Sequence, residues 1–128
     1  TAAITTGSST TNTNDSSAVE LYNVSSWSET TELNTTRRTH FGSGISTSTI
    51  VSSGQHPPGA NTVNAETWNG SAWTEVNDMA KARGNMGNAG PNTAAITAGG
   101  YDGTPAPYNG ETEEWNAAEL EIKTVTTS

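Results

Sequence analysis

A repeat of about 46 residues runs through the sequence and limits the folds open to it. A Glu-x-aromatic triplet occurs three times, and its aromatic residues Tyr22, Trp68 and Trp115 lie 46 and 47 positions apart. Trp27 and Trp73 are again 46 apart. A period of 20–50 residues is typical of solenoids, propellers and arrays, in which each unit packs on its neighbours. The spacing therefore predicts several similar units in place of one continuous core.

Other residues follow the same spacing. Ile4, Ile50 and Ile96 recur 46 apart in Thr-, Ala- and Ser-rich runs, and so do Arg37 and Arg83 ahead of glycine-containing runs. No stretch shows helical periodicity, whereas such runs closed by glycine are typical of short strands. The pattern predicts four strands in each unit. In chain order they are the run after the arginine, the isoleucine run, the Glu-x-aromatic run and the run with the second Trp. Repeats built only from strands favour a β-propeller.

The dipeptide Asn69-Gly70 lies between Trp68 and Trp73 and predicts a tight hairpin between the third and fourth strands. Both residues tolerate positive φ, as a two-residue type I′ turn requires. The last unit has no such dipeptide and no second Trp, so residues 117–128 predict a variant final strand.

Counted in this way, the chain is all-β and holds eleven strands, or about two and three-quarter four-stranded antiparallel blades. We expect a partial blade at 1–34 with strands two to four, a complete blade at 35–80 and a terminal variant blade at 81–128. Propellers typically contain about 4–8 blades. The chain is therefore expected to be part of a propeller that missing repeats or other subunits complete.

Composition excludes several partners. The net charge is −8 with only five Lys and Arg residues, which are too few to follow a phosphate backbone, so no nucleic-acid partner is expected. The chain has no Cys and hence no disulfide framework. It contains no apolar run of about 18 residues, so we expect no membrane insertion. Spaced Trp and Gly residues favour an ordered protein over a disordered one, although the apolar fraction is only 30%.

The repeated aromatic residues, Tyr22, Trp27, Trp68, Trp73 and Trp115, could stack on sugar rings. Their recurrence in each unit instead favours packing of blade against blade, because Trp buries a large area and dominates such contacts. We therefore expect them, together with the repeated arginines, to be structural.

The repeated glutamates Glu20, Glu66 and Glu113 are expected to pair with Arg37 or Arg83 or to remain solvated. Glycoside hydrolysis needs one asymmetric pair of acids, and a repeated residue does not supply it. The chain has two histidines, His40 and His56, and neither lies in a spacing typical of a zinc site. The sequence therefore predicts no catalytic residue, no metal site, no cofactor and no enzyme.

The connections between second and third strands are expected to be long and irregular: Ser8–Ala18, Gln55–Asn61 and Tyr101–Gly110. Loops on a rigid scaffold usually carry recognition. Four side chains in these loops are our candidate binding residues: His56, Tyr101, Asp102 and Tyr108.

The whole pattern resembles a kelch-type repeat. Thr93–Gly100, Glu66–Val76 and Ala82-Arg83 are similar to stretches that recur in tandem in the degenerate kelch-like repeats of marine bacteriophage structural proteins. The resemblance implies a galactose-oxidase-like propeller and, in phage, a component of the virion surface or tail fibre. The chain departs from it at Ser53-Gly54 and Thr6-Gly7, which replace the Gly-Gly of the repeat.

The lead expectation is a non-enzymatic virion appendage or tail-fibre module that displays loops to a host surface or to other structural chains. Its expected partners are other virion structural proteins or further copies of itself, with a host-surface glycan as another candidate. Its expected location is the virion surface or another extracellular site. The main alternative is a secreted bacterial carbohydrate-binding or adhesin propeller, and a fragment of a propeller oxidase or lyase is a third interpretation.

Overall fold

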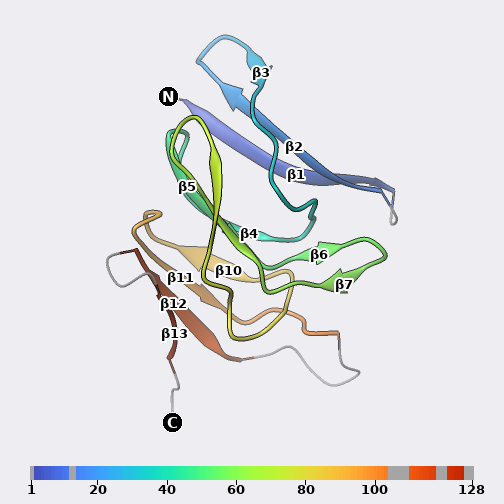
Figure 1. The fold of residues 1–128 in the computed structure, drawn as a ribbon, viewed down its shortest axis with the longest axis vertical. Helices are drawn as coiled ribbons and strands as arrows, with labels where there is room; N and C mark the ends of the chain where they lie inside the picture. The colour runs from blue at the N-terminus through green and yellow to red at the C-terminus, as the bar shows by residue number, and fades with distance from the viewer. Residues whose placement is uncertain (1, 12–13, 104–109, 118–120, 126–128) are drawn as a thin grey trace.

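The computed structural model places three antiparallel sheets one below another, with no helix in the part of the chain that it describes (Figure 1). The structure describes residues 2–11, 14–103, 110–117 and 121–125. Within these ranges, no helix is long and apolar enough to cross a membrane. The prediction of an all-β fold built from several antiparallel sheets is confirmed.

Neighbouring strands within each sheet follow one another along the chain, apart from one inserted hairpin. The first sheet contains β1 (Ala3–Thr11), β2 (Asn14–Tyr22) and β3 (Trp27–Glu29). The second contains β4 (Phe41–Ile45), β5 (Ser48–Ser52), β8 (Ala65–Trp68) and β9 (Trp73–Val76). The third contains β10 (Gly87–Ala89), β11 (Ala94–Ala98), β12 (Thr112–Asn116) and β13 (Glu121–Val125). The inserted hairpin consists of β6 (Gln55–His56) and β7 (Ala60–Asn61).

The pairing register repeats with the sequence period. Trp68 pairs with Trp73 across β8 and β9, and Tyr22 pairs with Trp27 across β2 and β3. The ring centroids are 5.3 Å apart in the first pair and 5.2 Å apart in the second, with interplanar angles of 37° and 41°. Residues related by the period thus occupy matching places in different sheets.

The turn after Trp68 differs from the one that the sequence predicts. Because Trp68 pairs with Trp73, the loop has four residues, and only Gly70 of the Asn-Gly pair has a positive φ, at 97°. The side-chain oxygen of Asn69 accepts hydrogen bonds from the backbone N–H groups of Ser71 and Ala72, at 3.0 and 2.9 Å. The type I′ prediction is wrong because the asparagine side chain, not its backbone, shapes the turn.

Apolar side chains fill the two spaces between successive sheets. The first space holds Val19, Leu33, Val51, Trp68 and Trp73, with Ile4 and Leu21 packed against them. The second holds Phe41, Ile50, Ala95 and Trp115, with Val76, Met86 and Ala117 packed against them. The core is therefore divided into two layers, each made by the facing sides of two sheets.

Two of the three connections predicted to be irregular contain strands. Most of Ser8–Ala18 continues the ribbon of β1 and β2, in which Ser9 pairs with Asp15. Residues Gln55–Asn61 form the β6–β7 hairpin. In Ser8–Ala18 the irregular prediction is wrong because a Thr- and Ser-rich segment can pair as a ribbon without an apolar face. In Gln55–Asn61 it is wrong because the prolines occupy the turn, so that Gln55 and His56 can pair with Asn61 and Ala60. In the third connection, residues 104–109 lie outside the described part of the chain.

Trp27 departs from the prediction that every repeated aromatic residue packs between sheets. It is 48% exposed, whereas Trp73 at the matching position is 7% exposed. The Trp73 indole N–H donates to the Thr31 carbonyl at 3.1 Å, and its ring packs with Leu33. Both partners lie in the segment that arrives from the first sheet. In the described residues no such segment or sheet covers the outer face of the first sheet, so Trp27 remains exposed.

This difference predicts unequal effects of removing the two indoles. Trp73→Ala should lower the free energy of unfolding by about 3–5 kcal/mol because it empties part of a packed layer. Trp27→Ala should cost about 1 kcal/mol, the worth of an exposed aromatic pair. Urea denaturation of the two variants measures both values, and equal losses would contradict the arrangement of the layers.

Candidate functional site

The connections between second and third strands gather on one side of the stack. In Figure 1 the far end of the β1–β2 ribbon, the β6–β7 hairpin and the chain after β11 all lie on the right-hand side. The sheets hold these segments in a fixed order, one from each sheet. Since recognition usually resides in loops that a rigid scaffold positions, this end is the candidate binding surface.

Arg38 joins the first of these connections to the second. Its backbone N–H and C=O both pair with Gln55 at 2.9 Å, and its side-chain Nε donates to the Gln55 side-chain oxygen at 3.2 Å. Its guanidinium also lies 2.5 Å from one carboxylate oxygen of Asp15, whose side chain is fully buried. The second carboxylate oxygen of Asp15 is buried without a hydrogen-bond partner in the described structure. The first two loops are therefore tied together by charge as well as by backbone pairing.

Tyr101 begins the third connection and is held by its backbone. Its N–H donates to the Gly84 carbonyl at 2.8 Å, and its C=O accepts from the Gly84 N–H at 2.9 Å and from the Asn61 side-chain amide at 2.8 Å. Tyr101 is nevertheless 38% exposed. The neighbouring Asp102 carboxylate lies 3.3 Å from the Lys81 ammonium. An accessible phenol is thus presented from a fixed backbone next to charged and amide groups.

The structure brings the predicted binding residues together only in part. Tyr101 and Asp102 are adjacent, and His56 lies half-buried at the end of β6 in the neighbouring connection. Tyr108 falls outside the described residues. Sequence reasoning missed Arg38, although it follows a repeated arginine directly, and it missed Asn61, which carries no signal in the sequence because its partner is a distant carbonyl.

Two buried ion pairs lie where the chain leads from one sheet into the next. Arg37 contacts Glu66 at 2.6 Å, and Arg83 contacts Glu113 at 2.7 Å. All four side chains are at most 1% exposed. Burial lowers the pKa of Arg37, and the nearby Glu66 carboxylate opposes that shift. The carboxylates of Glu66 and Glu113 are therefore each paired with a buried arginine.

Backbone groups complete both pairs. One terminal nitrogen of each guanidinium donates to two backbone carbonyls, those of Ser53 and Asn64 for Arg37 and those of Gly99 and Glu111 for Arg83. The Glu66 carboxylate also accepts the N–H groups of Asn34 and Thr35, at 2.8 and 3.1 Å. Glu66 thus binds the segment that leads from the first sheet into the second in two ways, through the backbone N–H groups of that segment and through its arginine.

Glu20 occupies the same repeat position in the first sheet and differs from its two counterparts. It is exposed, and no arginine accompanies it among the described residues. The arginine that serves each glutamate comes from the segment that enters its own sheet. No such segment precedes β1 in the described structure.

His40 lies at the junction of the first two sheets. One ring nitrogen is 2.8 Å from the Thr6 hydroxyl, and the other is buried without a partner in the described structure. A Cβ at Gly7 or Gly54 would meet atoms of His40 at 2.9 and 2.7 Å, so both glycines make room for it. Burial, and after it the charge of Arg37, lowers the pKa of His40 to about 4. The imidazole is therefore neutral at pH 7.

No group of three His, Asp or Glu side chains in the described residues is placed to hold a metal ion. The sequence matches no protein-family model and no curated protein.

The two environments of the repeated glutamates predict different costs of neutralising them. Glu66→Gln leaves Arg37 as an unpaired buried charge and should destabilise the fold by about 3–5 kcal/mol. Glu20→Gln changes an exposed side chain and should stay within about 0.5 kcal/mol of the parent. Chemical denaturation of the two isosteric variants provides the comparison. A large loss in Glu20→Gln would show that this carboxylate has a buried cation as partner.

His40 predicts a specific dependence of stability on pH. Above pH 6.5 the ring is neutral in both the folded and the unfolded chain, so its titration contributes nothing. Between pH 6.5 and about 4 the unfolded chain binds a proton that the folded chain does not, so stability falls as the pH falls. This loss should reach about 3 kcal/mol at pH 4.

The variants His40→Gln and His56→Gln test this dependence. The first should lack that part of the loss between pH 7 and 4, while the second should retain it. Denaturation midpoints measured across this range decide the matter, and an unchanged slope in His40→Gln would contradict the assignment.

Proposed function

We propose that the chain is a non-enzymatic module of a kelch-like β-propeller, carried on a bacteriophage virion appendage or tail fibre. In this proposal the three sheets are consecutive blades, and further repeats or further subunits complete the ring. The shared register of the sheets and the recurring Arg–Glu pairs support the propeller interpretation. The resemblance of the repeat to phage structural proteins supports the virion context.

The loop end of the stack is proposed as the surface that contacts a host glycan or another protein. The observation that carries this proposal is Tyr101, whose backbone is fixed by three hydrogen bonds while its side chain remains exposed. An aromatic face next to the charged Asp102 and Lys81 offers a stacking surface and polar partners, the combination that a sugar ring requires. Preorganisation of the backbone lowers the entropy lost on binding.

A non-enzymatic role is supported by the ion pairs that several carboxylates form within the fold. Glu66 and Glu113 are each neutralised by a buried arginine, and Asp102 pairs with Lys81. Acid catalysis requires a carboxyl group that can exchange a proton with a substrate. These three carboxylates are occupied by cations instead.

The binding proposal predicts that Tyr101→Ala weakens binding to host cells or to an array of host-surface glycans at least about tenfold. Ile45→Ala is the control, because Ile45 is 65% exposed at the opposite end of the sheets. It should leave binding unchanged. Equal binding by the parent and by Tyr101→Ala would contradict the assignment of the surface.

The virion context has its own test. An antibody raised against the chain should label purified phage particles in electron micrographs. Label on the surface of a bacterium, with none on particles, would favour the secreted carbohydrate-binding or adhesin propeller, for which the same Tyr101 surface would serve.

A further inference from the structure

The turns that follow β2 and β8 have the same construction. Each begins with an asparagine whose side-chain oxygen accepts the backbone N–H groups two and three residues further on. The distances are 3.0 and 2.9 Å at Asn69 and 3.2 and 3.1 Å at Asn23. A serine hydroxyl, of Ser71 or Ser25, donates to the same oxygen. Both asparagines are exposed, so the two turns form a matched pair within one chain.

The two turns differ at the residue after the asparagine. That residue is Gly70 in one turn and Val24 in the other, and both have a positive φ, at 97° and 85°. Neither of their N–H groups donates a hydrogen bond within the part of the chain that the structure describes. The branched side chain of Val24 stands next to its own backbone nitrogen, whereas glycine has no side chain there. The Gly70 nitrogen therefore has open access that the Val24 nitrogen lacks.

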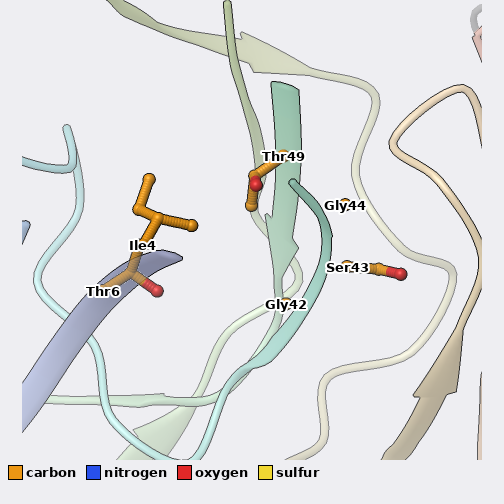
Figure 2. Close-up of a pocket in the computed structure, with 6 residues that line it drawn as sticks. All are labelled: Ile4, Thr6, Gly42, Ser43, Gly44 and Thr49. Carbon is orange, nitrogen blue, oxygen red and sulfur yellow. The ribbon is translucent and has the colours of Figure 1, made fainter. Parts of the chain in front are cut away.

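The strands on either side hold the Asn69 turn in place. Gly70 lies against the turn between β4 and β5, since a Cβ at Gly70 would meet the Thr47 carbonyl oxygen at 3.4 Å. Figure 2 shows Gly44 and Thr49, which pair with each other next to that turn, and Thr49 also pairs with Trp68 across β5 and β8. The turn is thus ordered, although the nitrogen at its second position stays unbonded.

The hydrogen bonds to the Asn69 side-chain oxygen make the carboxamide carbon a better electrophile. N–H donors aimed at a carbonyl oxygen stabilise the negative charge that develops there when a nucleophile attacks, as in an oxyanion hole. The Gly70 nitrogen closes a five-membered ring when it attacks this carbon, so the reaction is intramolecular and needs no second molecule to be positioned. An electrophile and an unblocked nucleophile therefore lie side by side in an exposed turn.

We propose that Asn69 is a site of spontaneous deamidation in the folded protein. A base in the solvent removes the Gly70 N–H proton, and the nitrogen forms a bond to the Asn69 Cγ. The bond from Cγ to Nδ2 breaks, and the nitrogen takes a proton from water and leaves as ammonia. Water then opens the succinimide ring at either carbonyl and gives aspartate or isoaspartate. Both products add a negative charge, and isoaspartate also lengthens the backbone between β8 and β9.

The test incubates the intact chain at mildly alkaline pH and follows each asparagine by peptide mapping with mass spectrometry. Conversion at Asn69 should be at least about tenfold faster than at Asn23 in samples whose circular dichroism stays that of the folded chain. Asn109-Gly110 is a second Asn-Gly dipeptide, and Asn109 lies outside the described residues. The peptide map therefore has to separate the two dipeptides.

Two variants test the role of the second turn position. Gly70→Ala should slow conversion of Asn69 at least about tenfold, because the added methyl group shields the nitrogen. Val24 shows that this turn accepts a side chain at a positive φ. Val24→Gly should bring the conversion of Asn23 to within about tenfold of the rate at Asn69, because it supplies the open nitrogen in a turn with the same hydrogen bonds.

A urea-unfolded sample provides the reference rate. Conversion of Asn69 in the folded chain should be within about tenfold of the rate in urea. A greater suppression would show that the turn protects Asn69 and would overturn the proposal. Equal rates at Asn69 and Asn23 in the folded chain, or an unchanged rate at Asn23 in Val24→Gly, would also overturn it. The turn is separate from the Tyr101 surface, so none of these results bears on the proposed function.

Discussion

The stack depends on the buried arginine–glutamate pair that forms where the chain leads from one sheet into the next. An unpaired charge in such a position costs several kcal/mol, so Arg37 can be accommodated only where Glu66 and two backbone carbonyls converge on it. This requirement fixes where the segment leaving the first sheet enters the second. Arg83 and Glu113 impose the same requirement one sheet later. A buried ion pair adds little net stability over an apolar alternative, so its main effect here is to define one arrangement of successive sheets.

That arrangement explains how a chain with an apolar fraction of 30% sustains a packed interior. The core consists of two layers, each bounded by two sheets, and a few large side chains fill most of each layer. Trp68 and Trp115 supply the indoles that face the preceding sheet, while small Ser, Thr and Ala side chains occupy much of the rest of the strands. Large aromatic residues at repeated positions thus compensate for scarce aliphatic ones.

The same construction produces two surfaces of different character. Connections between second and third strands present Tyr101 and its neighbours from a fixed backbone at one end of the stack. The outer face of the first sheet instead presents repeat positions, Glu20 and Trp27, whose counterparts are buried in the next sheet. The first surface offers side chains held by hydrogen-bonded backbone, and the second offers an exposed carboxylate and an exposed indole.

The sequence by itself determined the all-β class, the position of most strands and the residues that share a place in the repeat, because spacing and strand propensity are local properties. It did not determine that Trp27 is exposed while Trp73 is buried, since the difference comes from a neighbouring sheet and not from either residue. It also missed the β6–β7 hairpin and the turn formed by the Asn69 side chain, where short polar segments have several conformations of similar local energy. Only the tertiary structure selected among them and brought Asn61 to Tyr101, because those choices depend on contacts between residues far apart in the chain.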